Sequence, residues 1–187
     1  MSQESVEIVR QPIKVTARPR RRPEERLLVR FPRVLVLLSR ALDRLPLHSR
    51  LRRALVHRST RMFFEAGNRN DYEMAFALYH PRCESSFPPE LPTVGSDPGT
   101  HSREERLLFQ RKWISEWGEF RFDPDEVIDF GDGRFLVLGY VRGSGLASGA
   151  GFDNEWAGLF TFSAGRVIRE QVFLDHADAL QAAGLSE

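Results

Sequence analysis

The feature of the sequence that most constrains the fold is a series of apolar segments between residues 126 and 174, separated by short turns. Gly131-Asp132-Gly133 and Ala164-Gly165 are residue combinations that favour tight turns between antiparallel strands. With the Gly/Ser-rich segment 143–151 as a third connection, the predicted strands are 126–130, 134–142, 152–163 and 167–174. Such a meander forms a twisted sheet, and one face of that sheet must be buried against other elements.

Helical patterns supply the elements that can cover this sheet. The predicted helices span about residues 49–67, 72–79, 102–117 and 177–183, from apolar residues at three- and four-residue spacing. Asp71, Ser102 and Asp175 stand where helix N-caps are needed. Helices followed by an antiparallel meander indicate an α+β fold in which the helices pack on the concave face of a curved sheet.

Charge divides the chain unevenly. Residues 1–61 carry 16 Arg or Lys side chains against five acids, and the remaining residues carry 11 against 21. We expect residues 1–24 to form a disordered basic tail, because they contain few apolar side chains and no periodicity. Residues 25–48 are predicted to form an amphipathic helical extension, and residues 49–187 the folded domain.

The basic segment has two interpretations. It folds against the acidic domain, or it contacts nucleic acid or a membrane surface through its arginines and its amphipathic helix. The first interpretation is favoured, because no aromatic residues that could stack on bases are interleaved with the arginines.

Cysteine usage and motif content narrow the chemistry. Cys83 is the single cysteine, so no intrachain disulfide can form, and a reducing, cytoplasmic compartment is expected. No Cys/His cluster indicates a metal site, and the Gly/Ser-rich segment 143–151 joins two strands and lacks the GKS/T of a phosphate loop. No run approaches the length of a membrane-spanning helix. The sequence therefore predicts neither a metal nor another cofactor.

Several motifs, in this order, resemble those of one superfamily. They are the segment 66–72 (AGNRNDY) with 78–81 (LYHP), the helix around Trp113, the turn 164–167 (AGRV) and the ending 174–180 (LDHADAL). Together they resemble a SnoaL-like member of the nuclear-transport-factor-2-like superfamily, over about residues 61–185. The resemblance implies a cone-shaped fold with a small-molecule pocket, and a homodimer. It is weak for activity, because this fold carries many functions.

The resemblance also allows a test for steroid-isomerase chemistry. That mechanism needs a carboxylate base, and a tyrosine with a protonated aspartate to polarise a carbonyl group. The corresponding positions of this sequence are occupied by Phe87, Phe63 and Gly158. None of these can transfer a proton, so the steroid-isomerase mechanism is not expected.

Three other ionisable residues are candidates for catalysis. If Gly158 faces inward, strand alternation turns Glu170 inward as well, and Glu170 is then the best candidate for a general base. The alternatives for Glu170 are a solvated glutamate or a partner of an arginine such as Arg142. Asp153 would face the pocket only if a bulge reverses the phase of its strand. His176, at the end of the last strand, is the third candidate.

The alignment, strand alternation and the aromatic stripe of Phe109, Trp113 and Trp117 along one helix face predict which residues line the pocket; the alternative for the stripe is that it forms the core. Most are aromatic or apolar, which suits a flat apolar ligand. They are Phe63, Tyr79, Phe87, Trp113, Trp117, Asn154, Trp156, Gly158 and Val172.

Two functions fit these observations. The first is a pocket for a small, largely apolar molecule, for which the resemblance admits lyase, isomerase or cyclase chemistry. The alternative is a non-catalytic dimerisation or protein-interaction module with a basic N-terminal arm.

Overall fold

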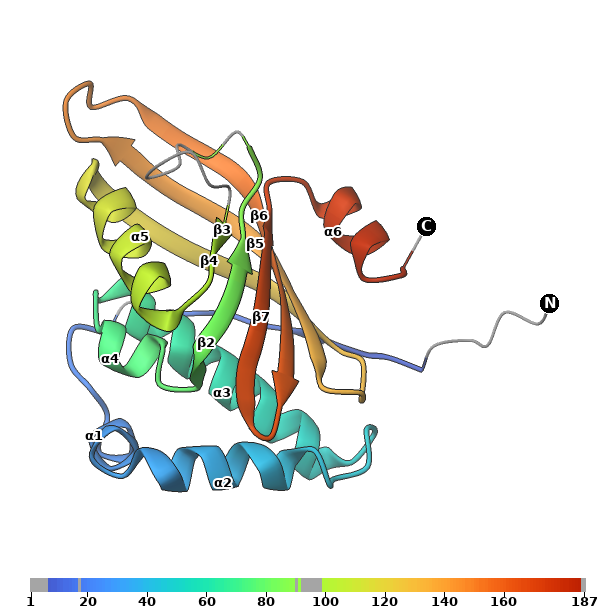
Figure 1. Cartoon of the computed structure of the whole chain (residues 1–187). Coiled ribbons are helices and arrows are strands. Elements are labelled where there is room, and N and C mark those ends of the chain that lie inside the picture. The colour runs from blue at the N-terminus through green and yellow to red at the C-terminus, as the bar shows by residue number, and fades with distance from the viewer. Residues whose placement is uncertain (1–6, 17, 90, 92–98, 186–187) are drawn as a thin grey trace.

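The computed structural model describes residues 7–16, 18–89, 91 and 99–185. Within these residues, one curved sheet of seven strands wraps around helices, as Figure 1 shows. The strands are β1 (Val9–Pro12), β2 (Tyr79–Ser86), β3 (Gly99–Thr100), β4 (Trp117–Asp129), β5 (Arg134–Gly145), β6 (Gly151–Ser163) and β7 (Arg166–Phe173). The helices are α1 (Pro23–Arg30), α2 (Pro32–Leu42), α3 (Arg50–Asn68), α4 (Tyr72–Ala75), α5 (Arg103–Ser115) and α6 (His176–Ala182). None of these helices is long and apolar enough to cross a membrane.

The sheet contains the predicted meander. Its order is β1-β4-β5-β6-β7-β2-β3, in which β4 to β7 are antiparallel neighbours and β2 pairs with β7 in parallel. Ala164 and Gly165 have φ values of 51° and 74°, as a tight hairpin turn requires. β4 is longer than predicted and begins at Trp117, where a helix was expected to end. Pro124 lies where the register with β5 shifts at a bulge.

The helices occupy both faces of the sheet and one end of it. α3 and α5 pack on the concave face, and α6 packs on the convex face over Ile128, Leu136 and Leu159. α1 and α2 lie across one end of the curved sheet, in front of α3 (Figure 1). The α+β cone is therefore confirmed, and α1 and α2 close one end of it.

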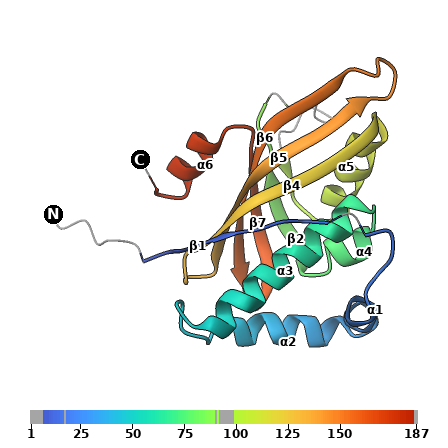
Figure 2. The same ribbon diagram turned by 180° about the vertical axis from the view of Figure 1, so that it is seen from behind.

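The N-terminal region differs from the expected disordered tail. Val9–Pro12 form β1 on the edge of β4, and Ile13 enters the core at 2% exposure. Figure 2 shows β1 running beside β4, with α3 crossing nearby. The unpaired edge of β4 offers backbone hydrogen-bonding groups that β1 satisfies, and this contact was invisible to local periodicity. Residues 1–6 lie outside the described residues.

The helical extension consists of two helices. α1 lies largely within the predicted extension, residues 25–48, and it ends before Pro32, which starts α2 because proline fits the first turn of a helix but not its interior. Arg52 of α3 anchors the end of α2, because its Nη1 atom donates to the carbonyl oxygens of Leu42 and Leu45 at 3.1 Å each. Its Nε and Nη2 atoms pair with the buried Asp129 of β4 at 2.7 and 2.9 Å.

Candidate ligand-binding cavity

A cavity of about 520 Å³ lies between α1, α2, α3 and the concave face of the sheet. This volume falls within the range of known small-molecule sites. Its walls are predominantly apolar and include many aromatic rings. They include Phe63, Phe64, Phe135, Trp156, Phe160 and Phe162.

A buried ion pair forms the polar side of the cavity. The guanidinium of Arg106 donates to the Glu170 carboxylate from Nε at 2.6 Å and from Nη2 at 3.1 Å, and the Ser85 hydroxyl donates to the same carboxylate at 3.0 Å. Arg106 and Glu170 are 6% and 2% exposed. Burial lowers the pKa of Arg106, but the charge of Glu170 and its hydrogen bonds outweigh burial, and the net pKa is raised. Both side chains are therefore charged, and both oxygens of the Glu170 carboxylate already accept hydrogen bonds.

Gln110, one helical turn beyond Arg106, brings an amide to the cavity. Its Oε1 atom accepts a hydrogen bond from Arg106 Nη1 at 2.8 Å. A guanidinium has donors only, so this contact fixes the orientation of the amide. The Nε2 group, for which the described residues provide no hydrogen-bond acceptor, is left as a donor on a residue that lines the cavity.

Tyr79 and Cys83 contribute neutral groups. Burial, followed by the nearby charge of Glu170, raises the pKa of Tyr79 well above its ordinary value. The same two causes raise the pKa of Cys83 to about 12. Cys83 is therefore a buried thiol without thiolate character, and Tyr79, which lines the cavity, keeps its hydroxyl proton.

The mouth of the cavity lies between α1, α2 and α3. Leu27, Val34, Leu38 and Leu55 line the cavity, yet they are between 40% and 57% exposed. α2 is held over the sheet by a close approach to the β6–β7 turn, where Arg40 Nε donates to the Ala164 carbonyl at 2.8 Å. A Cβ on Gly165 would come within 2.6 Å of the Val36 carbonyl oxygen, so glycine is required beneath α2.

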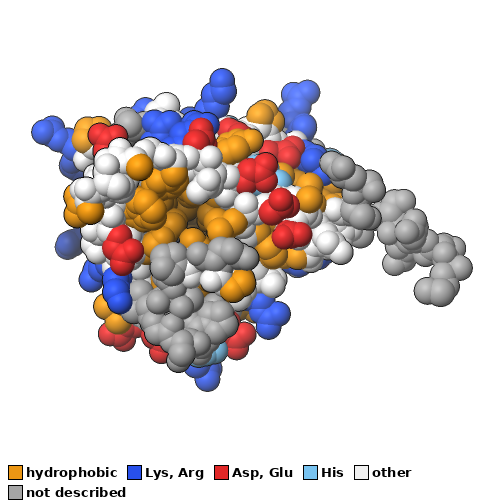
Figure 3. Space-filling model, turned by 90° about the horizontal axis from the view of Figure 1, so that it is seen from above, with side chains coloured by type: hydrophobic (Ala, Val, Ile, Leu, Met, Phe, Trp, Pro, Cys, Tyr) orange, Lys and Arg blue, Asp and Glu red, His pale blue; other side chains and the backbone are white. Residues whose placement is uncertain are grey.

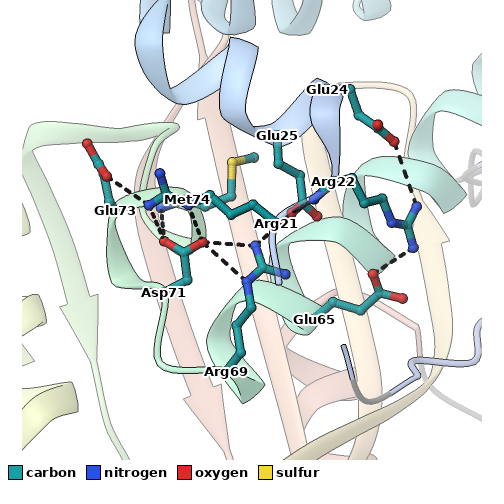
Figure 4. Close-up of polar contacts among 9 residues, drawn as sticks. All are labelled: Arg21, Arg22, Glu24, Glu25, Glu65, Arg69, Asp71, Glu73 and Met74. Atoms are coloured by element: carbon teal, nitrogen blue, oxygen red, sulfur yellow. Dashed lines mark hydrogen bonds and ion pairs between the residues drawn. The ribbon is translucent and has the colours of Figure 1, made fainter. Parts of the chain in front are cut away.

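The arginines ahead of α1 fasten this helix to the domain, as Figure 4 shows. Arg21 pairs with Asp71 through two contacts of 2.6 Å, and Arg22 pairs with Glu65 at 2.7 Å. Arg69 joins Asp71 to the buried Glu25 of α1. The interpretation that the basic segment folds against the acidic domain is thus confirmed for Arg21 and Arg22.

The structure separates the three predicted catalytic residues. Glu170 lines the cavity, but its partner is Arg106 and not Arg142. Asp153 is exposed at the far end of β6, where it pairs with Arg142 at 2.9 Å. The His176 ring contacts the carbonyl oxygens of Gly139 and Trp156 at 2.8 and 3.1 Å and so fastens α6 to the sheet. Neither Asp153 nor His176 lines the cavity.

The predicted pocket-lining residues also fall into two groups, those that line the cavity and those that do not. Phe63, Tyr79 and Trp156 line the cavity, whereas the remaining six predicted residues do not line it. Phe87 stacks on Phe109, while Trp113 contacts Phe120 edge to face and Trp117 contacts Phe152 at a tilt. Gly158 and Val172 are buried in the sheet, and Asn154 is exposed. These six residues lie elsewhere because the cavity is displaced toward α1 and α2. The aromatic cluster occupies the other end of the cone. On the face opposite α1 and α2, hydrophobic side chains gather in a hollow (Figure 3).

Sequence reasoning missed Arg106 and Gln110. Arg106, Phe109, Gln110 and Trp113 follow at helical spacing, and all four are buried. An arginine and a glutamine within the buried stripe of a helix could have served as the signal, because such groups need partners. Among the described residues, no cluster of His, Cys, Asp or Glu side chains could hold a metal ion.

The cone-shaped α+β fold with an internal cavity is that of nuclear-transport-factor-2-like proteins. The model of the SnoaL-like domain matches residues 60–170, which is more than half of the sequence. The chain belongs to the SnoaL-like family.

Solved structures share this fold. A nuclear-transport-factor-2-like protein of unknown function from Burkholderia pseudomallei is 25% identical, with a TM-score of 0.56 over 66% of this chain and 93% of that one. A SnoaL-like polyketide cyclase from Jannaschia is 19% identical, with a TM-score of 0.52 over 67% and 88%. TerC, co-crystallised with polyporic acid, is 19% identical, with a TM-score of 0.55 over 66% and 94%. Among curated proteins, no relative matches the sequence.

Proposed function

We propose that this protein binds a small, largely apolar molecule that carries a hydrogen-bond acceptor at one end. The observation that carries the proposal is the combination of an apolar cavity of about 520 Å³ with one amide donor, Gln110 Nε2, left unpaired on its wall. Gln110 is 4% exposed, and a ligand carbonyl or hydroxyl oxygen in the cavity could accept a hydrogen bond from this donor. The apolar walls would bury the remainder of the ligand.

Binding is better supported than catalysis. Both oxygens of the Glu170 carboxylate already accept hydrogen bonds from Arg106 or Ser85, so this residue does not face the cavity as a free base. We assign Glu170 the role of positioning Arg106, which in turn orients Gln110. The ligand found in TerC supports a small organic molecule as the ligand class.

Two matched probes test this function. α-Tetralone and tetralin have nearly the same shape, but only tetralone carries a carbonyl acceptor. Isothermal titration calorimetry should show that both bind and that tetralone binds about three- to tenfold more tightly, as expected for one hydrogen bond. Gln110→Glu keeps an acceptor for Arg106 and removes the donor, so this preference should disappear. Equal affinities in the wild type would contradict the role of Gln110.

The cavity itself is tested at Gly67 of α3. Gly67 lines the cavity, and a Cβ added there would meet no other atom within 4 Å. Gly67→Leu should fill part of the cavity and weaken the binding of both probes, whereas Gly67→Ala serves as the matched control with nearly unchanged affinity. Unchanged binding in Gly67→Leu, with the fold intact by circular dichroism, would place the ligand elsewhere.

A further inference from the structure

The exposed surface of α1, α2 and the first half of α3 is unusually apolar. The four rim residues, Leu27, Val34, Leu38 and Leu55, are continued on the same helices by Phe31, Leu37 and Leu51, which are 48–61% exposed. We call these seven side chains the apolar face. Single exposed apolar residues are ordinary, but seven on three helices that border one cavity indicate a contact surface.

The same helices are strongly basic. Residues 23–61, which include α1, α2 and the first half of α3, contain ten arginines and three acids, Glu24, Glu25 and Asp43. Some of these arginines have partners within the protein, such as Arg52 with Asp129 and Arg58 with Glu24. Six exposed arginines pair with no described acid. They are Arg26, Arg30, Arg33, Arg44, Arg50 and Arg53.

We propose that the apolar face binds an anionic membrane surface, with the mouth of the cavity turned toward the lipid. Helices that combine exposed leucines with flanking arginines lie in the interface of a bilayer, where the apolar side chains enter the acyl boundary. Each nearby arginine adds attraction to anionic headgroups. The charge and the apolar side chains on α1, α2 and α3 are therefore explained by one partner.

The two other occupants explain only part of this surface. Nucleic acid would account for the arginines but would leave the seven apolar side chains in contact with phosphates or water. A second copy of the chain would cover the apolar side chains, but a two-fold axis on this face would bring the two sets of unpaired arginines together, and like charges repel.

Membrane docking also defines a route for the ligand, and this part rests on the proposed function. The rim residues would lie in the interface, so an apolar molecule dissolved in the bilayer could pass into the cavity without crossing water. The ligand class would then be a membrane-partitioning molecule with one oxygen acceptor.

Vesicle flotation with the full chain tests the docking. The protein should float with vesicles of mixed phosphatidylcholine and phosphatidylglycerol, and should stay behind with phosphatidylcholine alone. The double variant Leu37→Gln with Leu51→Gln changes two side chains of the apolar face that do not line the cavity. It should reduce binding about tenfold or more. Leu108→Gln with Leu146→Gln, at two equally exposed leucines elsewhere, is the matched control and should bind like the wild type.

The arginines have their own pair of variants. Arg33→Gln with Arg53→Gln should also reduce vesicle binding about tenfold or more, whereas Arg82→Gln with Arg111→Gln removes two exposed arginines outside this surface and should change little. Thermal melting checks that each variant is folded.

Three results would overturn the proposal. The first is no flotation with anionic vesicles, and the second is equal binding of face and control variants. The third is binding of another partner in the absence of vesicle binding. A second copy would be that partner if Leu37→Gln with Leu51→Gln abolishes dimerisation in analytical ultracentrifugation. Nucleic acid would be that partner if the arginine variants alone abolish oligonucleotide binding. Tetralone binding in solution should be unaffected by these variants, because the changed residues do not line the cavity, so failure of docking is separable from failure of the cavity.

Discussion

The two ends of the cone differ in how their interior is filled. At the end near the long strands, the rings of Trp113, Trp117, Phe120 and Phe152 contact one another in edge-to-face and tilted geometries, with centroid distances as short as 4.4 Å. At the end near α1 and α2, the walls are equally apolar but enclose about 520 Å³. The same curved sheet therefore supports a packed aromatic cluster, with a hollow on its outer face, at one end and a cavity at the other, and the N-terminal helices decide where the cavity opens.

The largest predicted effect comes from truncating the aromatic cluster. Trp113→Ala should lower the free energy of unfolding by about 3–5 kcal/mol, because the lost contacts have no replacement in a close-packed cluster. Phe63→Ala, at the cavity, should cost about half as much, since one side of that ring already lacks neighbours. Urea denaturation measures both, and equal losses would erase the contrast between the two ends.

The buried ion pair should be the next most sensitive feature. Glu170→Gln leaves the Arg106 charge uncompensated in an apolar surrounding, and we expect a loss of about 3 kcal/mol of unfolding free energy. The control is Glu84→Gln, which affects an exposed pair with Arg169 and should cost less than about 1 kcal/mol. A similar small effect at both sites would mean that Arg106 finds another partner.

Much of the fold could be predicted from local sequence, but only part of the candidate site could. The strands around the turns at Gly133 and Gly165, and the helices capped by Asp71, Ser102 and Asp175, follow from short-range chemistry. β1 could not be predicted, because it depends on the edge of β4, more than 100 residues away.

The candidate site shows the same limit. Strand alternation placed Glu170 inside, but its partner Arg106 comes from a helix 64 residues earlier, and alternation carries no information about such a contact. The position of the cavity along the cone depends on how α1 and α2 close it, so the aromatic stripe of α5 was assigned to the pocket although it belongs to the aromatic cluster at the other end.

Acid should loosen the attachment of α1. Burial raises the pKa of Asp71, but hydrogen bonds from Arg21 and Arg69 outweigh burial and hold it below its ordinary value. The stabilisation that Asp71 provides is therefore present above its ordinary pKa of about 4 and is lost as pH falls through the lower, folded-state pKa. In thermal melts, Asp71→Asn should be destabilised by about 1 kcal/mol at neutral pH, and this difference should shrink below about pH 4. A difference that does not change with pH would mean that the cap, and not the charge, is lost.

The smallest effect is expected at the cavity wall. Gly67→Ala replaces a helical glycine where a methyl group has room, so the protein should gain about 0.5–1 kcal/mol in unfolding free energy. A loss measured by the same urea titration would show that α3 is strained at this position.

The central claim is that the ligand enters the end closed by α1 and α2. Methyl NMR spectroscopy with α-tetralone tests it directly, since Leu78 and Val137 line the cavity, whereas Ile114 and Val141 belong to the core at the end with the aromatic cluster. The account predicts large shifts for the methyl groups of Leu78 and Val137 and small ones for Ile114 and Val141. The reverse pattern, or no shift at saturating tetralone, would contradict it.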